Sequence, residues 1–549
     1  MQKLVMRITL PLVAVMFAAM IVLVSCSGPT SDLDKPGADN TLRRGNIAEP
    51  STLDAHKSEG VSSGNVLRDL YEGLVAENPD GSLGPGTAQR WEISEDGLTY
   101  RFYLRDDARW SNDDPVVAED FVAGLRRTVD PATASGYAKS LSPIVNAPEV
   151  IRGELPPSAL AVSAPAPDIV EIELRQATPY LLGLLTNSPT YPLHRASFEA
   201  HGEDFARPGN LVSNGPYRLV NWRVGDRLTI ERNPYYWGAD AVAIERVEFL
   251  PIEDTGTELN MFRAGELDYT SNVPSALFST LRETYGAQFS VYPLLSVYFL
   301  AFDMREPPFD DIRVREAATR AVDRDDFVDV VLGTGQPGAW GLVPPGVDGY
   351  ESFAYAWRDE PRAAQLARAR ELYAQAGYSD ERPLRFELLY NTSDNHKKNA
   401  VAVQAMLREN IGAEVSLINQ EWKVMLENRK SPESWDLLRL GWTGDYNDAN
   451  TFLETFRSGH PQNTSGYADP QFDALLDRAN LEPDPQTRAN LLAEAEEKLM
   501  LAYPVLPLYF YVSKHLISDR VEGYQPNIMD RTYSKHLRLA QPSQASLTQ

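Results

Sequence analysis

Cysteine is nearly absent from this sequence, which has a single thiol, that of Cys26, in 549 residues. One cysteine excludes disulfide bonds within the chain. Positive charge is also scarce, because 52 Lys and Arg residues stand against 77 Asp and Glu residues, a net charge of −25. A nucleic-acid partner would demand a basic face, so we expect none.

Metal-binding patterns and repeats are missing as well. The seven histidines form no H-x-H or HExxH pair, which argues against a zinc hydrolase, and we expect no metal or other cofactor. No repeat of about 20 to 50 residues is visible, which argues against solenoids and propellers. With 549 residues, 43% of them hydrophobic and 23% charged, the chain predicts two or three globular domains.

A long apolar run, residues 8–24, follows Lys3 and Arg7 at the N-terminus and predicts a secretory signal peptide over 1–25. A short anchor helix is the alternative, since the run is at the lower limit for spanning a bilayer. The run ends in LVSC (23–26), which resembles the bacterial lipobox. We therefore expect a lipoprotein with its lipid on Cys26, a flexible linker over 26–41, and an extracytoplasmic location at a membrane, in the periplasm or at the cell surface.

The middle of the chain mixes strand-like and helical patterns. Residues 91–104 predict a hairpin, 217–231 a second β-rich run, and 42–71 short strands with one helical turn. Residues 146–168 are rich in Pro and Ala and predict an exposed loop. Between 361 and 441 the sequence pattern switches between that of helices and that of strands. It predicts helices at 361–376, 396–410 and 421–430 and strands at 384–390, 413–419 and 435–441.

In chain order, the five segments from 384 to 441 alternate strand, helix, strand, helix and strand. This βαβαβ series implies a parallel sheet with right-handed crossovers. Ligands of such sheets lie beyond the carboxyl ends of the strands. There the sequence places His396, Trp422, Trp442 and Asp445, which we expect at one edge. Arg439 lies inside the apolar third strand, where a guanidinium needs a carboxylate partner to offset its desolvation.

Two catalytic or metal motifs do not fit their context. GVSSG (60–64) matches the G-x-S-x-G nucleophile elbow, but the polar DAHKSE precedes it where an apolar strand is required. DYND (445–448) is similar to a calcium loop but lacks the glycine at the sixth place and the glutamate at the twelfth. We therefore expect no enzyme; a secreted hydrolase is the alternative from a different class.

Several segments closely resemble bacterial oligopeptide-binding proteins, the solute receptors of ABC peptide importers. They are LDAHKSEGV (53–61), NGPYRLVNW (214–222), ERNPYYW (231–237), FDDIRVREA (309–317), LYNTSDNHKK (389–398), NQEWK (419–423) and RLGWTGDYND (439–448). The resemblance runs in order through most of the chain. It implies an α/β, three-lobed fold like that of the type II periplasmic binding proteins, which closes on an extended peptide.

The resemblance also implies how the chain divides and what it contacts. Lobe I would comprise 42–71, 195–295 and 513–540, an extra β-rich domain (lobe II) 72–194, lobe III 296–512, and a disordered tail 541–549. Partners would be short peptides and the permease subunits of an ABC transporter, bound by a monomer. A receptor of this fold for a dipeptide, cell-wall peptide, sugar, nickel or haem, or a peptide sensor, is the alternative.

The family's binding positions carry over residue by residue. The aspartate that pairs with the peptide α-amino group falls on Asp445, and the groups near the peptide carboxylate fall on Arg439, Arg429 and His396. Side-chain pockets would be lined by Trp422, Trp442, Tyr511 and Tyr137, and the peptide backbone would bond to segments that include Glu59, Val61, Gly441 and Thr443. A family lysine aligns with Leu332 and a pocket glutamate with Ala301, so peptide length and charge preference stay open.

Overall fold

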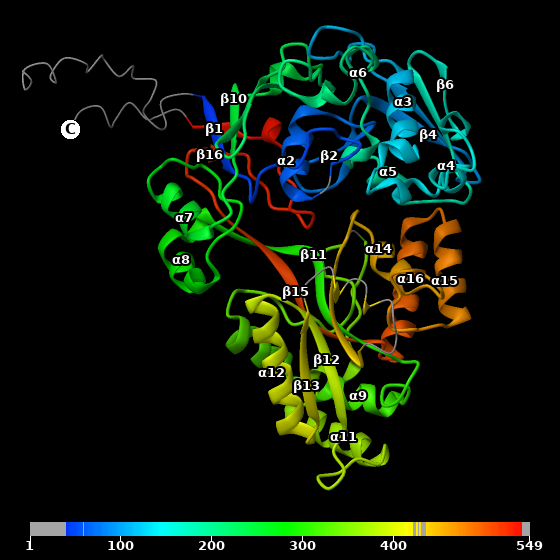
Figure 1. The fold of residues 1–549 in the computed structure, drawn as a ribbon, viewed down its shortest axis with the longest axis vertical. Helices are drawn as coiled ribbons and strands as arrows, with labels where there is room; N and C mark the ends of the chain where they lie inside the picture. The colour runs from blue at the N-terminus through cyan, green and yellow to red at the C-terminus, as the bar shows by residue number, and fades with distance from the viewer. Residues whose placement is uncertain are drawn as a thin grey trace, which may run out of the picture.

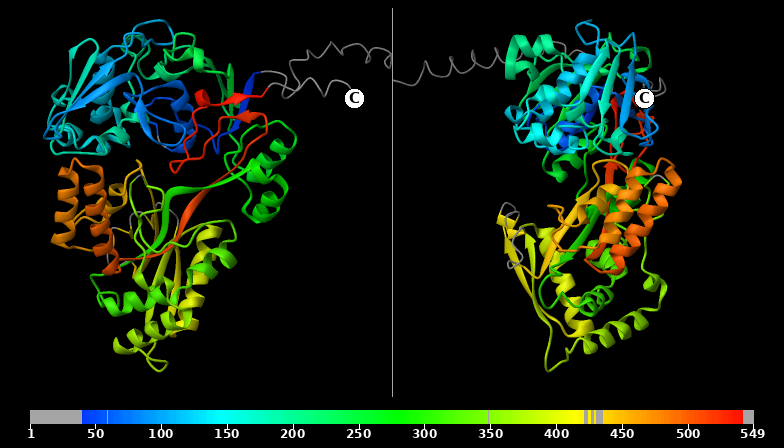
Figure 2. Two further views of the ribbon diagram at one scale, coloured as in Figure 1. Left: turned by 180° about the vertical axis from the view of Figure 1, so that it is seen from behind. Right: turned by 90° about the vertical axis from the view of Figure 1, so that its right-hand side faces the viewer.

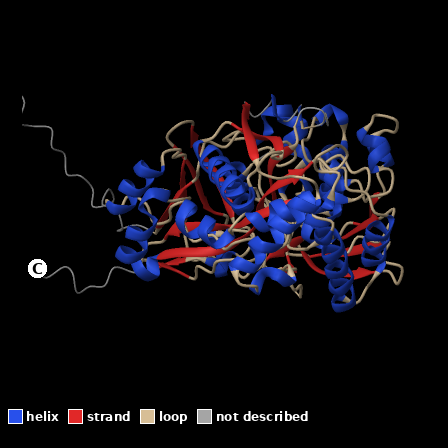
Figure 3. Cartoon of the chain, turned by 90° about the horizontal axis from the view of Figure 1, so that it is seen from below, coloured by secondary structure: helices blue, strands red, loops and turns tan. Residues whose placement is uncertain are grey.

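The computed structural model describes residues 40–540 except 59, 348, 421–423, 426–427 and 430–434. Its elements gather into an upper and a lower half, joined by two long paired strands, β11 (Phe289–Phe302) and β15 (Val505–Leu516) (Figure 1). The two halves stay distinct when the molecule is turned (Figure 2). Helices and strands intermix along the whole length, as in an α/β protein (Figure 3).

The upper half contains two four-stranded sheets. One has the order β1-β10-β9-β8, with β1 parallel to β10, and the other is the antiparallel sheet β4-β5-β7-β6. Their bounds are β1 (Thr41–Gly45), β8 (Tyr217–Arg223), β9 (Arg227–Arg232), β10 (Arg246–Leu250), β4 (Ala88–Ile93), β5 (Thr99–Leu104), β6 (Val162–Ala166) and β7 (Ile169–Glu173). Two-stranded ribbons pair β2 (Val75–Glu77) with β3 (Leu83–Pro85) and β16 (Val521–Glu522) with β17 (Arg538–Leu539).

The helices of the upper half pack into one core that both sheets share, from Leu42 and Leu67 to Phe121 and Val247. They are α2 (Val61–Leu70), α3 (Ala118–Val129), α4 (Ala147–Ile151), α5 (Leu181–Leu184) and α6 (Arg195–His201). Beside the upper ends of β11 and β15 lie α7 (Thr255–Arg263) and α8 (Phe278–Tyr285), with their own small core (Figure 1).

The lower half is built on a five-stranded sheet with the order β13-β12-β14-β11-β15. It adds β12 (Arg385–Asn391), β13 (Glu414–Gln420) and β14 (Leu437–Thr443) to the two joining strands. Its helices are α9 (Ile312–Ala321), α10 (Arg324–Asp326), α11 (Arg362–Gln375), α12 (Asp394–Ile411), α14 (Asn450–Leu453), α15 (Pro470–Leu481) and α16 (Pro485–Leu501).

Strand β11 is apolar at nearly every position from Leu295 to Phe302, because both of its faces are buried. Val297, Phe299 and Ala301 point into the core under α15 and α16. Tyr298, Leu300 and Phe302, the alternate residues, point into the core under α9, α11 and α12. Because successive side chains of a strand face opposite sides, a sheet covered on both faces needs apolar residues at every position.

The βαβαβ prediction is confirmed in the described residues. Strand β12 pairs in parallel with both β13 and β14, and each bound lies within two residues of the predicted one. Helix α11 follows Pro361, and the chain leaves it at Gly377, whose φ of 88° favours glycine. The helix expected at 421–430 lies largely outside the described residues.

Two local predictions need correction. The segment 146–168 is not a loop throughout, because it holds α4 and strand β6, an edge strand of its sheet where Pro165 is tolerated. The single helical turn expected within 42–71 is the ten-residue helix α2, which buries Val66, Leu67 and Leu70 on one face. The hairpin predicted at 91–104 is present as β4-β5, and the β-rich run predicted at 217–231 forms the antiparallel pair β8-β9.

Candidate ligand-binding cleft

A cavity of about 520 Å³ lies at the junction of the two halves, and we call it the cleft. The N-terminus of α2, the segment 184–191, the end of β14, part of β15 and the segment 529–531 all contribute to its walls. Of the predicted site residues that the structure describes, five line it, namely Val61, Tyr137, Thr443, Asp445 and Tyr511. Val61 and Tyr137 are 58% and 41% exposed, so part of each residue is open to solvent.

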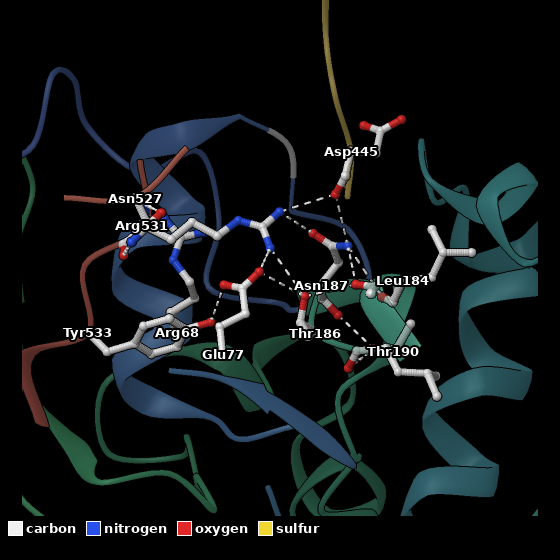
Figure 4. Close-up of polar contacts among 12 residues, drawn as sticks. Arg68, Glu77, Leu184, Thr186, Asn187, Thr190, Asp445, Asn527, Arg531 and Tyr533 are labelled. Carbon is white, nitrogen blue, oxygen red and sulfur yellow. Dashed lines mark hydrogen bonds and ion pairs between the residues drawn. The ribbon is translucent and has the colours of Figure 1, made fainter. Parts of the chain in front are cut away.

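Asp445 follows directly on β14, and its side chain opens into the cleft. Among the described residues, no hydrogen bond or ion pair to its carboxylate oxygens is present, and Figure 4 shows the carboxylate turned away from Arg531. The surrounding walls desolvate the carboxylate, which raises the pKa of Asp445 above its usual range, and the Arg531 guanidinium opposes this shift. Within the described chain, this desolvated carboxylate therefore has no cation in contact with its oxygens.

The backbone of Asp445 is held by the upper half. Its carbonyl oxygen accepts a hydrogen bond of 3.3 Å from the Arg531 guanidinium and one of 3.5 Å from the Asn187 amide (Figure 4). Arg531 in turn forms an ion pair of 2.5 Å with Glu77 and donates to the Asn187 side-chain oxygen at 2.8 Å. The next residue, Tyr446, stacks on Tyr180 of the upper half with ring centroids 4.6 Å apart.

Arg439 is partly buried in β14 and faces no carboxylate in the part of the chain that the structure describes. Its guanidinium donates to the side-chain oxygen of Asn391 at 3.3 Å and to the Tyr511 hydroxyl at 3.2 Å, and it lies 4.6 Å from the ring centroid of Tyr298. Its Nε is buried without a hydrogen-bond partner. The carboxylate expected to neutralise Arg439 is thus not found among these residues, because an amide, a hydroxyl and an aromatic face surround it instead.

His396 lies in the first turn of α12, where its backbone N–H is capped by the Ser393 hydroxyl. Its ring is 5.7 Å from that of Tyr298, the same ring that Arg439 covers, and its Nδ1 is buried without a partner. Burial, and then the Arg439 charge, lower the pKa of His396 to about 4. The imidazole is therefore neutral at pH 7 and offers a hydrogen bond rather than a charge.

The other predicted residues are placed as follows. Gly441 and Trp442 lie at the end of β14 beside β11, and the Trp442 ring packs against the core under α15 and α16. Arg429 is partly buried in the turn that follows Asn428. Glu59, Trp422 and Cys26 lie outside the described residues, as do the predicted signal peptide and the tail 541–549.

Sequence patterns did not point to four polar residues of the cleft, namely Arg68, Asn187, Lys514 and Arg531. Arg68, Asn187 and the pair Lys514 and Arg531 are separated by more than a hundred residues from one another, so no spacing rule brings them together. A second cavity of about 500 Å³ adjoins the cleft at Asp445, and Lys139, Arg175 and Tyr180 line it. Within the described residues, no group of three or more His, Cys, Asp or Glu side chains could hold a metal ion. Over the same part of the chain, no helix has the length and hydropathy of a membrane span.

Comparison with known proteins decides the family. Residues 82–464 match the profile of the bacterial extracellular solute-binding proteins, family 5 Middle. The chain is 38% identical over 501 residues to the periplasmic oligopeptide-binding protein OppA of Escherichia coli (strain K12), covering 90% of this chain and 92% of that one. The chain belongs to this family of solute-binding proteins. The family consists of receptors rather than enzymes.

Solved structures of relatives have the same fold, which confirms the predicted α/β binding-protein architecture. The unliganded open form of the periplasmic murein tripeptide-binding protein MppA superposes with a TM-score of 0.83 at 35% identity, covering 91% of this chain and 97% of that one. The Haemophilus influenzae OppA complex with RPPGFSPFR gives 0.74 at 35% identity, covering 92% and 100%. This family and fold agree with an extracytoplasmic solute-binding role.

Proposed function

We propose that this protein is an extracytoplasmic receptor that captures short peptides in extended form and delivers them to an ABC importer. The observation that carries the proposal is the Asp445 carboxylate, which lies at the cleft without a cation for its oxygens in the described residues. The free α-amino group of a peptide supplies that cation. Relatives named as oligopeptide-binding, one of them in complex with a peptide, support the same ligand class.

The opposite end of the peptide would meet the group formed by Arg439, His396 and Tyr511. The Arg439 guanidinium, short of a carboxylate, would take the peptide carboxylate, with a hydrogen bond from His396. Each residue of an extended chain advances about 3.3 Å, so the distance between the two ends sets the preferred length. The segments that would bond to the peptide backbone include Glu59, Val61, Gly441 and Thr443.

The remaining parts of the proposal concern anchoring and motion. Lobe I (42–71, 195–295, 513–540) and lobe II (72–194) would close on lobe III (296–512), with β11 and β15 as the hinge that crosses between the halves. A lipid on Cys26 would hold the monomer at the membrane, beside the permease subunits of the transporter. Intact mass of the mature protein tests the anchor, since acyl chains add a fixed mass.

Native mass spectrometry of the purified protein tests the ligand class directly. We expect co-purifying peptides of a few residues, which calorimetry with synthetic tri- to pentapeptides should reproduce. A purified protein that carries a bile salt, sugar or haem and binds no peptide would contradict the proposal. A cell-wall peptide is the second candidate ligand, because a periplasmic murein peptide-binding protein is 36% identical to this chain over 481 residues, and the same spectra distinguish it by mass.

A further inference from the structure

The charge of the cleft runs against the charge of the whole chain. The protein carries a net charge of −25, yet the Arg, Lys and His residues that line the cleft are Arg68, Lys514, Arg531 and His515, against the carboxylates of Asp445 and Asp530. Cations concentrated in a low-dielectric cavity of an acidic protein select for negative ligands. The question is which of these charges are left for a ligand.

Two of the cations that line the cleft, His515 and Arg531, are each paired with a carboxylate of the protein itself. His515 and Asp530 are joined at 2.8 Å, which holds the charge of both inside the pair. Arg531 is paired with Glu77 at 2.5 Å, and its two terminal nitrogens also donate to Thr186, Asn187 and the Asp445 carbonyl. Apart from these two pairs, the charged residues that line the cleft are one anion, Asp445, and two cations, Arg68 and Lys514.

Arg68 has no carboxylate contact among the described residues. Its guanidinium donates at 2.6 Å to the Asn65 side chain one turn earlier in α2, and its Nε is buried without a partner. Burial lowers the pKa of Arg68, and the like charge of Arg531 lowers it further, because the two guanidinium groups repel one another. An anion in the cleft would relieve this repulsion.

Lys514 is equally short of an anion. It lies on β15 opposite Val291 of β11, and its ammonium is 5.9 Å from the ring centroid of Phe278. Within the described residues it makes no ion pair or hydrogen bond through that ammonium. Burial alone lowers the pKa of Lys514, as expected of a partly desolvated amine without a counter-ion.

From this balance, and resting on the proposed function, we propose that Lys514 and Arg68 form a second carboxylate subsite in the cleft, which favours peptides that carry an acidic side chain. A neutral peptide brings one ammonium for Asp445 and one carboxylate, for which Arg439 is already available. It leaves Lys514 and Arg68 without counter-charges. A peptide with a Glu or Asp residue supplies the missing negative charge.

The test measures the affinity of the full-length mature protein for tetra-alanine and for tetra-alanine with Glu, Gln or Lys at each position in turn, by calorimetry. We expect at least one Glu peptide to bind at least tenfold more tightly than tetra-alanine, and the matching Gln and Lys peptides to gain nothing. Repeating the series with C-terminal amides separates a side-chain carboxylate from the terminal one. If the advantage of Glu disappears on amidation, the subsite takes the chain end and the proposal is wrong.

Variants assign the subsite to its residues. Lys514→Met should bring the best Glu peptide to within about threefold of tetra-alanine, and Arg68→Met should reduce the advantage in the same direction. Lys514→Arg keeps the charge and should keep the preference. Lys498→Met is the matched control, because Lys498 pairs with Asp469 and lines neither cavity.

The outcomes distinguish failure of the carboxylate subsite from failure of the proposed peptide-receptor function. A Lys514→Met protein that retains the full preference overturns the subsite, provided its unfolding temperature matches the wild type. Tetra-alanine that binds as well as every Glu peptide overturns the subsite while leaving the peptide receptor intact. Failure of all the peptides to bind overturns the proposed function and the subsite with it.

Discussion

The Arg531 guanidinium donates a hydrogen bond of 3.3 Å to the carbonyl oxygen of Asp445, from the upper half of the molecule to the lower. The contact orients the end of β14 so that the Asp445 carboxylate faces the cleft while its backbone is held from behind (Figure 4). A ligand-binding group fixed in this way loses little conformational entropy when the ligand arrives. Arg531 therefore acts by positioning, not by touching the ligand ammonium.

Replacing Arg531 with Gln should destabilise the protein and weaken binding. Both partners of the Arg531–Glu77 pair are nearly buried, with side chains 12% and 5% exposed, so the variant leaves the Glu77 charge without its partner at a cost of about 3–5 kcal/mol. Denaturant unfolding measures this loss. The double variant Glu77→Gln/Arg531→Gln removes the stranded charge and should recover part of the stability; a double variant no more stable than the single one would contradict this account.

Asp445→Asn is expected to reduce the affinity for free tri- to pentapeptides by at least a hundredfold, since the amide keeps the shape but removes the charge that the ammonium needs. N-acetylated peptides provide the matched test on the ligand side. They should bind the wild type as weakly as free peptides bind the variant, and acetylation should cost nothing further in the variant. If N-acetylation of the peptide and Asp445→Asn each reduced the affinity and the two losses added in the variant, the ammonium would be bound elsewhere.

The sequence predicted the sheet that carries this site better than the site itself. The parallel strands β12, β13 and β14 follow from local periodicity and from Gly and Pro at the helix ends, which act within a few residues. Asp445, Arg439 and His396 could be named because they follow or occupy those strands. Asn187, Arg531, Arg68 and Lys514 come from segments up to several hundred residues apart, and only the packing of the two halves brings them to the cleft.

The environment of Arg439 illustrates the same limit. A guanidinium inside an apolar strand implied a carboxylate, but Asn391, Tyr511 and the face of Tyr298 surround it in the described chain. These groups stabilise a cation without cancelling its charge. The sequence could reveal the unusual position of Arg439 but not that its charge stays available.

Arg439→Gln should therefore weaken peptides with a free C-terminal carboxylate and spare those with a C-terminal amide. We expect a loss of about tenfold to a hundredfold for free acids, because a charge-assisted hydrogen bond to a carboxylate is worth about 1.5–3 kcal/mol. Calorimetry with acid and amide forms of one peptide measures the difference. Lys498→Met, which removes a positive charge that lines neither cavity, is the control and should leave both the acid and the amide affinities unchanged. Equal losses for both forms in Arg439→Gln would exclude a role at the carboxylate end.

Affinity should fall as the solution becomes acidic, and the sign of the change identifies the group responsible. The pKa of Asp445 is raised in the free protein, so its carboxylate takes up a proton at a higher pH than an ordinary aspartate and loses its attraction for the ammonium. Below that pKa the affinity should drop about tenfold for each pH unit. His396 has the opposite effect, since protonation near its pKa of about 4 would strengthen a carboxylate contact. Affinities measured over a pH series distinguish the two contributions. The Asp445→Asn variant, and the wild type with N-acetylated peptides, should lose no affinity between neutral pH and pH 5. The His396→Gln variant should lose affinity over this range as the wild type does.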